Sequence, residues 1–216
     1  MHRVVVPALG QVLFAVGLGY AGMAGISILA NTLGKPFGFD ARETTFFLSM
    51  GIGTVLAAWV VDGRGLGGSL ALSWPTDRRT VIWFADVLLL VLAAEAIAAV
   101  SGFLGSIEDL KAMSSSERSW LGFLNAVLLA PVVEEVLFRG LLFTRLRQRF
   151  STWPVLAVVT LAFGLLHAEN GLLHVVSVLP AGAFLGFARE YSGGIGLPIV
   201  LHACMNLAIV AAGTLL

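Results

Sequence analysis

Seven long apolar stretches constrain the fold of this 216-residue chain more than any other feature. They cover residues 4–32, 45–61, 81–104, 120–143, 154–167, 172–188 and 199–216. Most approach the roughly 20 apolar residues that an α-helix needs to cross the hydrocarbon core of a bilayer. Because every backbone polar group in lipid must be bonded within the protein, helices are expected for such stretches. The sequence therefore predicts an all-α, polytopic transmembrane bundle of seven spans.

The composition is typical of an integral membrane protein. Hydrophobic residues make up 58% of the chain and charged residues 12%, against roughly 45–50% and 25% in soluble domains. Thirteen basic and thirteen acidic residues balance, so no excess of positive charge indicates a nucleic-acid partner. A single cysteine, Cys204, excludes an intrachain disulfide and a cysteine-based metal cluster. The composition predicts the lipid bilayer as a partner and no nucleic acid.

The distribution of basic residues predicts the orientation, because Lys and Arg favour cytoplasmic loops. With seven alternating spans, eight basic residues lie on one side of the membrane and four on the other. The larger group is Arg3, Arg64, Arg78, Arg79, Arg145, Arg147, Arg149 and Arg189, and the smaller is Lys35, Arg42, Lys111 and Arg118. We therefore expect a multi-pass protein of the plasma membrane with a cytoplasmic N-terminus and an exterior C-terminus. The first apolar stretch lacks a small-residue cleavage pattern and is expected to be retained.

The stretch "PVVEEVLFRG" places Glu134, Glu135 and Arg139 inside the fourth apolar stretch. On a helix, Arg139 follows Glu135 by one turn, the order that favours an ion pair, and lies roughly 140° round the axis from Glu134. Counting from Arg145, Glu134 is roughly 16 Å deep, near the middle of the hydrocarbon core. A carboxylate at that depth needs a proton, water, a cation or a histidine as a partner. We therefore expect Glu135 to be held by Arg139 and Glu134 to be free for chemistry.

Two histidines on other spans are candidate partners of Glu134. "FGLLH" ends the fifth stretch with His167 and has Phe163 one turn earlier on the same face, while "HACMN" begins the seventh with His202 and has Asn206 one turn later. Neutral imidazole can accept a proton, donate a hydrogen bond or bind a metal, and the Asn amide offers a donor. The pattern predicts a polar cluster within an apolar bundle.

These residues also have simpler structural explanations. Asparagine commonly bonds neighbouring transmembrane helices. The "ENG" break separates His174 from His167, so His174 is expected either to pack or to support the site from outside its inner residues. Depth is a further difficulty, since His167 lies roughly 20 Å from the cytoplasmic end and His202 only about 6 Å after Pro198. The two histidines can meet only if the last helix begins well below the surface, through a buried or re-entrant "GGIGLP" approach, or if the helices tilt strongly.

The order and spacing of the three motifs resemble a known family. Glu-Glu-x-x-x-Arg in "EEVLFR", Phe-x-x-x-His in "FGLLH" and His-x-x-x-Asn in "HACMN" are similar to the motifs of the CAAX protease and bacteriocin-processing (CPBP) family of intramembrane endopeptidases. That family includes the type II CAAX prenyl endopeptidases and the lysostaphin-resistance-protein-A-like proteins. The resemblance divides the chain into variable N-terminal helices, residues 1–118, and a catalytic core in the last four spans, residues 119–216.

The resemblance implies an enzyme that hydrolyses a peptide bond of a membrane-associated protein or peptide, as in CAAX-type or bacteriocin-type processing. The implied catalytic residues are Glu134 and His167, which activate water, and His202 and Asn206, which stabilise the oxyanion. The implied supporting residues are Glu135, Arg139 and Phe163. Prenylated tails are substrates of some relatives, but nothing in this sequence specifies recognition of a lipid group. The cavity is expected to open toward the cytoplasm.

Metal use and two other classes of function stay open. Glu134, His167 and His202 supply one oxygen and two nitrogens, a set that Zn²⁺ accepts with a fourth position open for water, although the HExxH pattern is absent. The family is described both as metalloproteases and as metal-free, glutamate-dependent enzymes, and the two descriptions differ on His202. The other classes are a catalytically idle membrane scaffold or immunity partner and a proton-coupled transporter. No internal sequence repeat favours a transporter.

Overall fold

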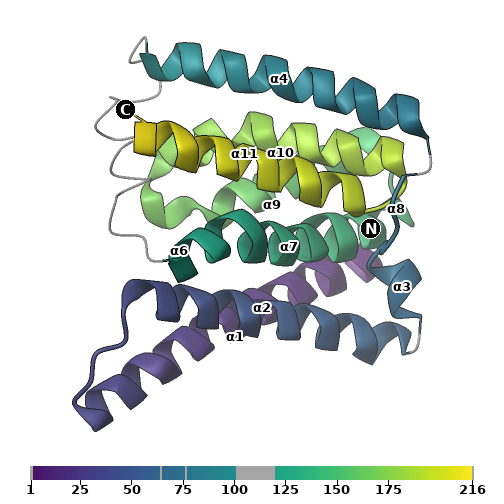
Figure 1. Cartoon of the computed structure of the whole chain (residues 1–216). Helices are drawn as coiled ribbons and strands as arrows, with labels where there is room; N and C mark the ends of the chain where they lie inside the picture. The colour runs from purple at the N-terminus through teal and green to yellow at the C-terminus, as the bar shows by residue number, and fades with distance from the viewer. Residues whose placement is uncertain (1, 64, 76, 101–119, 216) are drawn as a thin grey trace.

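The computed structural model is a bundle of helices (Figure 1) and describes every residue except 1, 64, 76, 101–119 and 216. The described residues contain no strand, so the all-α prediction is confirmed for them. The longer helices are α1 (His2–Leu33), α2 (Phe39–Asp62), α4 (Arg78–Val100), α9 (Thr152–Leu166), α10 (Leu172–Ser192) and α11 (Gly196–Leu215). Short elements are α3 (Leu66–Ser69), α6 (Trp120–Leu124), η1 (Asn125–Leu129), α7 (Ala130–Glu135), η2 (Val136–Leu142), α8 (Phe143–Arg147) and η3 (Ala168–Asn170).

Four helices among the described residues are long and apolar enough to cross a membrane. They are Pro7–Leu33, Phe39–Asp62, Trp120–Arg147 and Leu172–Ser192, and the shorter apolar helices Thr152–Leu166 and Gly196–Ala212 accompany them. The chain is therefore a multi-pass membrane protein. The count of seven spans stays a prediction, and the predicted end of the third span at residue 104 lies outside the described residues.

The continuous run α6–η1–α7–η2–α8 lies at the centre of the bundle (Figure 1). The α1–α2 pair packs on one side of this run, and α9, α10 and α11 pack on the other. Helix α4 lies outside α10 and α11 and contacts both. Because the central run has neighbours on both sides, its side chains Leu137, Phe138, Leu141 and Leu142 are almost fully buried. The core of the protein therefore surrounds the segment that carries "EEVLFR".

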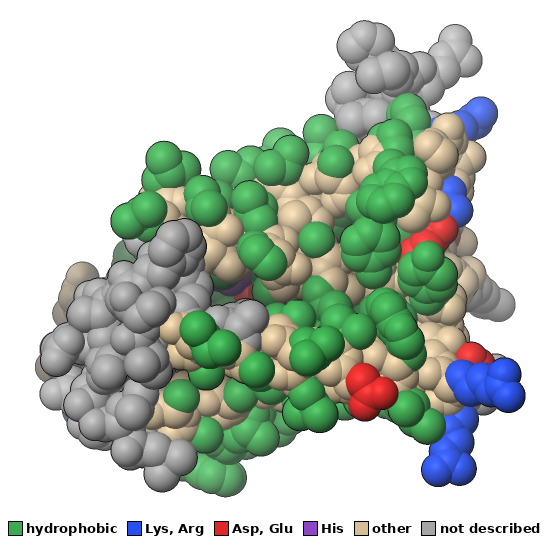
Figure 2. All heavy atoms as spheres, turned by 90° about the horizontal axis from the view of Figure 1, so that it is seen from above, with side chains coloured by type: hydrophobic (Ala, Val, Ile, Leu, Met, Phe, Trp, Pro, Cys, Tyr) green, Lys and Arg blue, Asp and Glu red, His purple; other side chains and the backbone are tan. Residues whose placement is uncertain are grey.

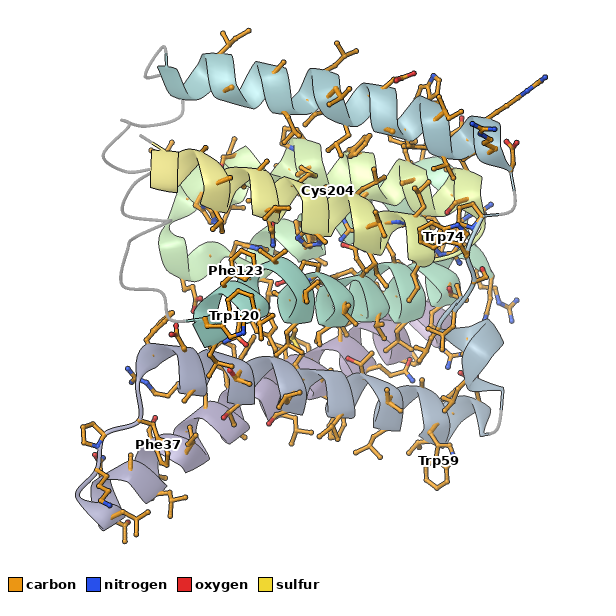
Figure 3. The ribbon with its side chains drawn as sticks, in the orientation of Figure 1. Phe37, Trp59, Trp74, Trp120, Phe123 and Cys204 are labelled. Atoms are coloured by element: carbon orange, nitrogen blue, oxygen red, sulfur yellow. The ribbon has the colours of Figure 1, made fainter. Side chains whose placement is uncertain are left out.

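The two ends of the bundle differ in charge. Basic side chains gather at one end, while much of the remaining surface in Figure 2 is apolar. We call this the arginine end; its members include Arg78, Arg79, Arg145, Arg147 and Arg149. An ion pair joins Arg145 to Asp62 at the C-terminus of α2, and Trp74 lies at the same end, whereas Trp120 and Phe123 lie at the opposite end (Figure 3). The N- and C-termini are also at opposite ends of the bundle (Figure 1).

The central run is not a regular α-helix, because η1 and η2 are π-helical turns. In η1 the Ala130 N–H bonds the Asn125 carbonyl, five residues earlier. In the same register the next carbonyl, that of Ala126, would accept from residue 131, but Pro131 has no N–H. Asn206 of α11 supplies the missing donor, since its Nδ2 lies 2.7 Å from the Ala126 carbonyl oxygen. The sequence predicted an uninterrupted helix over residues 120–143 and did not predict these wider turns.

The connection between α2 and α4 folds into the arginine end. We call residues 66–74 the 66–74 segment. Within it Leu70 is 2% exposed and packs with the core of the central run. The Leu70 carbonyl lies so close to Gly140 that a Cβ on that glycine would be 2.8 Å from the carbonyl oxygen. Ala71 has a φ of 49°, which is uncommon for a residue with a side chain. The segment therefore covers the arginine end of the central run.

The same segment fixes the start of α11. The N–H of Ile195 bonds the Ala71 carbonyl at 3.0 Å, and the N–H of Gly196 bonds the Ser73 carbonyl at 3.1 Å. Ile195 and Leu197 are each 2% exposed. Helix α11 thus begins below the surface, beneath the 66–74 segment, as the depth argument from the sequence required. This start carries the next turns of α11 to the level of the two glutamates.

Candidate active site

Glu135 joins three elements of the predicted site. Its Oε1 accepts a hydrogen bond from Arg139 Nη1 at 2.8 Å and another from His202 Nδ1 at 2.9 Å. Glu135 and Arg139 are fully buried, and His202 is 6% exposed. The ion pair expected from the i,i+4 spacing is present. The motif on the central run is thereby tied to α11.

Arg139 also bonds α10 and contacts α9. Its Nη2 donates to the Gly182 carbonyl at 2.7 Å, and its guanidinium carbon lies 4.5 Å from the centroid of the Phe163 ring. A Cβ on Gly182 would lie 3.1 Å from that ring, so a glycine allows this close approach. A buried charge is costly unless it is paired and hydrogen-bonded, and a cation over an aromatic face adds further attraction. Arg139 is therefore held by groups from three helices.

Glu134 has a different environment from its neighbour. It is 5% exposed, and its Oε2 lies 3.9 Å from His202 Nε2. No side chain or backbone group among the described residues forms a hydrogen bond with its carboxylate. A separation of 3.9 Å is too long for a direct hydrogen bond, and one water molecule beside the pair could bond both groups. The structure therefore leaves Glu134 buried, close to an imidazole and without a direct partner.

The hydrogen bonds of the two histidines identify their neutral tautomers. The Nδ1 of His167 lies 3.0 Å from the Phe163 carbonyl, and the Nδ1 of His202 lies 2.9 Å from a Glu135 carboxylate oxygen. Carbonyl and ionised carboxylate oxygens only accept hydrogen bonds, so each Nδ1 carries the proton. In the neutral ring each Nε2 is then an acceptor. His202 directs this acceptor toward Glu134.

His167 belongs to the same cluster and follows directly on the end of α9. Its ring centroid is 4.9 Å from that of Phe163, which is 5.8 Å from that of His202. His174, which the sequence assigned to packing or to support of the site, has its ring centroid 5.6 Å from that of His167. The short turn η3 brings the two rings together across the "ENG" break.

Asn206 lies one turn after His202 on α11, and its known contact is the bond to the Ala126 carbonyl. An amide NH₂ group has two donors, and this bond uses one of them. The observed bond is an interhelical tie of the kind that the sequence offered as the simpler explanation. It also holds the helix face that carries His202 against the central run.

Arg189 lies near the site, although in the sequence it contributed only to the predicted orientation in the membrane. Its Nε donates to the Arg139 carbonyl at 3.0 Å, and its Nη2 donates to Thr144 Oγ1 at 3.2 Å. The guanidinium carbon lies 5.2 Å from the centroid of the Phe143 ring. Arg189 therefore bonds the backbone at the π-helical turn η2, next to the glutamate pair. A basic residue directly after the sixth apolar stretch is the signal that could have drawn attention to it.

The residues that could hold a metal are few. The described residues contain no group of three His, Cys, Asp or Glu side chains that could hold a metal ion. The Nδ1 atoms of His167 and His202 are in hydrogen bonds, which leaves Nε2 as the free ring nitrogen of each, and the His202 Nε2 lies 3.9 Å from Glu134 Oε2. We therefore derive no chemical step through a metal.

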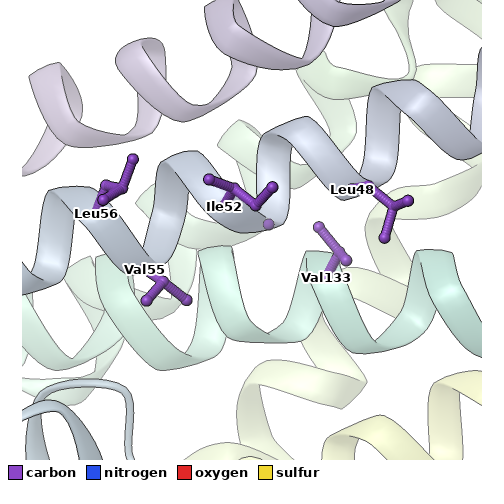
Figure 4. Close-up of a pocket in the computed structure, with 6 residues that line it drawn as sticks. Leu48, Ile52, Val55, Leu56 and Val133 are labelled. Atoms are coloured by element: carbon purple, nitrogen blue, oxygen red, sulfur yellow. The ribbon is translucent and has the colours of Figure 1, made fainter.

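An apolar groove lies near the glutamates, between α2 and α7 (Figure 4). Its volume is about 370 Å³, and it is lined by Leu48, Gly51, Ile52, Val55, Leu56 and Val133. None of these side chains can donate, accept or transfer a proton. The groove therefore adds apolar surface beside the cluster and contributes no acid–base chemistry.

Comparisons with known proteins agree with the motifs. Residues 116–208 match the family model described as type II CAAX prenyl endopeptidase Rce1-like. An uncharacterised 24.3 kDa protein of Escherichia coli is 26% identical over 184 residues, which cover 82% of this chain and 81% of that protein. No solved structure matches. The matched residues include both glutamates, Arg139, both histidines of the motifs and Asn206. Over residues 116–208, the chain is similar to the Rce1-like type II CAAX prenyl endopeptidases.

Proposed function

We propose that the protein is an intramembrane endopeptidase that hydrolyses a peptide bond of a membrane-associated protein or peptide. The family match supports peptide-bond cleavage as the reaction class. The observation that carries the proposal is the 3.9 Å separation between Glu134 Oε2 and His202 Nε2 within a buried cluster. A water molecule beside that pair would be in contact with a carboxylate that has no other partner among the described residues.

In this mechanism Glu134 is the general base. It takes a proton from the bridging water as that water attacks the carbonyl carbon of the substrate, and it later gives the proton to the leaving amine. His167, whose Nε2 is an acceptor in the neutral ring, orients the same water. The motifs contain no Ser, Thr or Cys that would suggest a covalent intermediate. Water is therefore the direct nucleophile.

The oxyanion that forms on the substrate requires hydrogen-bond donors. His202 in its protonated form donates from both ring nitrogens, and Glu135 at 2.9 Å from Nδ1 stabilises that positive charge. Asn206 has a second amide N–H besides the one bonded to Ala126. We assign both residues to the oxyanion, with Glu135, Arg139 and Phe163 as the groups that position His202. This is the glutamate-dependent route rather than the metal-dependent one.

The proposed substrate is a protein or peptide segment at the membrane surface, and the bilayer is its environment. Residues 119–216 would form the catalytic core, and residues 1–118 would form N-terminal helices that pack beside it. The α1–α2 pair contacts the central run on the side away from His202, which suits a supporting role. We place the protein in the plasma membrane with a cytoplasmic N-terminus. Lipidation of the substrate is left open, because no described residue indicates a prenyl group.

A comparison of newly formed peptide termini in membranes tests the proposal. Cells would carry the wild type, Glu134→Gln, His167→Ala or a matched control, Glu190→Gln, which removes a carboxylate paired with Arg147 away from the cluster. We expect a set of termini that is present with the wild type and the control and absent with both site variants. Identical termini in all four samples, with equal amounts of protein, would favour the idle scaffold or immunity partner.

A further inference from the structure

Exposure within the candidate site increases in one direction. Glu135 and Arg139 are fully buried, and Glu134 and His202 are 5% and 6% exposed. His167 and His174 are only partly buried, and Ala168 and Glu169 between them are exposed. A polar path therefore leads from Glu134 through His202 and His167 toward the turn that contains η3. Substrate and water need such a path, because lipid supplies neither.

The turn at η3 lies at the bundle end opposite the arginine end. Helix α9 begins at Thr152, five residues after Arg147, and runs away from the arginine end to Leu166 (Figure 1). Helix α10 begins at Leu172 and returns to Ser192, so His174 is in its first turn. Both histidines therefore face the end away from the arginines.

The arginine end is filled by the 66–74 segment and by the start of α11. Leu70 and Ala71 are 2% and 8% exposed, and the Leu70 carbonyl lies against Gly140. A Cβ on Gly194 would lie 2.3 Å from the Ser73 carbonyl oxygen, so the segment and the approach to α11 are in direct backbone contact. Arg189, which bonds the Arg139 carbonyl and Thr144 Oγ1, lies on this side of the glutamates, and the backbone contacts of the 66–74 segment lie over this end. Access from the arginine end would require these backbone contacts to separate.

The surface view agrees with this direction. On the face seen in Figure 2, histidine and acidic side chains show at the bottom of a hollow in the apolar surface. The hollow lies on the half of the molecule away from the basic side chains. Histidine and acidic side chains are therefore open at the surface in the half of the molecule away from the basic side chains.

We propose that the candidate active site opens at the end of the bundle opposite the arginine end, with His174 at its mouth. Positive residues favour the cytoplasmic side, so this mouth faces the non-cytoplasmic side. The substrate would then be a segment of an exported or membrane-anchored polypeptide that is exposed outside the cytoplasm, rather than a cytoplasmic tail. The substrate part of the inference rests on the proposed function, whereas the position of the mouth is a property of the fold.

Thiol labelling tests the position of the mouth without any substrate. Cys204 would first be replaced by Ala, and single cysteines would be introduced by His174→Cys, Gln148→Cys at the arginine end, and Leu137→Cys in the fully buried core. The reagent is a membrane-impermeant biotin maleimide, added to intact cells or to inverted vesicles. We expect His174→Cys to be labelled in intact cells, Gln148→Cys only in inverted vesicles, and Leu137→Cys in neither. Labelling of His174→Cys only in inverted vesicles, or in neither preparation, would overturn the proposal.

The positions of cleaved bonds test the substrate class. Among termini that depend on Glu134, we expect the cleaved bonds to lie in segments on the side where His174→Cys is labelled. Bonds that lie on the side where Gln148→Cys is labelled would overturn the inference while leaving the endopeptidase proposal intact. If no termini depend on Glu134, the proposed function fails together with the substrate class, and the labelling still decides where the site opens.

Discussion

At the scale of single residues, two adjacent glutamates have different environments. Glu135 is fully buried and accepts hydrogen bonds from Arg139 and His202, whereas Glu134 is close to His202 without a direct bond. The difference follows from the helix, which turns consecutive side chains about 100° apart. One carboxylate can therefore hold the cluster together while its neighbour stays free for proton transfer.

Glu135→Gln is expected to destabilise the protein more than Glu134→Gln does. The substitution at Glu135 leaves the buried Arg139 without its counter-charge, and loss of one partner of a buried ion pair typically costs about 3–5 kcal/mol. The substitution at Glu134 removes no ion pair with Arg139. The free energy of unfolding, measured by titration with SDS in mild detergent, checks the difference. Equal losses of stability in the two variants would refute this division of roles.

The residue spacing predicted the Glu135–Arg139 pair because an i,i+4 contact lies within one helical turn. It also identified His167 and His202 as candidates, since imidazoles deep in apolar stretches are uncommon. The contact between His167 and His174 could not be predicted in this way. It depends on how η3 turns the chain, and seven residues separate the two histidines across a break.

At the scale of helices, the central run departs from α-helical geometry on both sides of the glutamates. In its π-helical turns, two backbone carbonyls accept hydrogen bonds from side chains of neighbouring helices. Asn206 of α11 donates to the Ala126 carbonyl, and Arg189 of α10 donates to the Arg139 carbonyl. Pro131 explains the first case, because it lacks the N–H that the wider turn would use. A periodicity analysis over residues 120–143 detects the apolar helix, but a single extra residue per turn is too small a change for it to find.

Asn206→Leu is expected to cost about 1–3 kcal/mol of unfolding free energy, since a buried carbonyl then lacks its donor. In a Pro131→Ala background the backbone N–H at position 131 becomes available to the Ala126 carbonyl, so the same substitution should cost less. Titration with SDS of the two single variants and the double variant gives the coupling between the sites. Additive effects would show that the Asn206 bond and the missing N–H are unrelated.

Gly140→Ala is expected to disturb the 66–74 segment. The new Cβ would lie 2.8 Å from the Leu70 carbonyl oxygen, which is a backbone atom and cannot move alone. Gly17→Ala is the matched control, because nothing lies within 4 Å of its Cβ position, and Ala is favoured over Gly in a helix by about 1 kcal/mol. Limited proteolysis between α2 and α4 should be faster in Gly140→Ala than in the control. Equal rates would contradict the close packing of this segment on the central run.

At the scale of the whole molecule, the apolar stretches predicted an all-helical membrane protein, because length and apolarity are sufficient to indicate a span. They could not show how the helices close the site. The connection "DGRGLGGSLALSWPTDRRT" is Gly-rich and basic, yet the 66–74 segment within it folds inward and fixes the start of α11. That packing brings His202 to the level of Glu134, and it is one of the observations behind the proposal that the site opens at the opposite end rather than toward the cytoplasm.

The rate of peptide cleavage by purified protein tests the central claim most directly. Wild type and Glu134→Gln would be reconstituted in lipid vesicles with a peptide that spans a bond identified from the cellular termini, and the products measured by mass spectrometry. Loss of a general base typically lowers the rate about 10²–10⁴-fold, so we predict a loss of that size with unchanged resistance to SDS. A Glu134→Gln variant that cleaves the peptide at the wild-type rate would contradict the account.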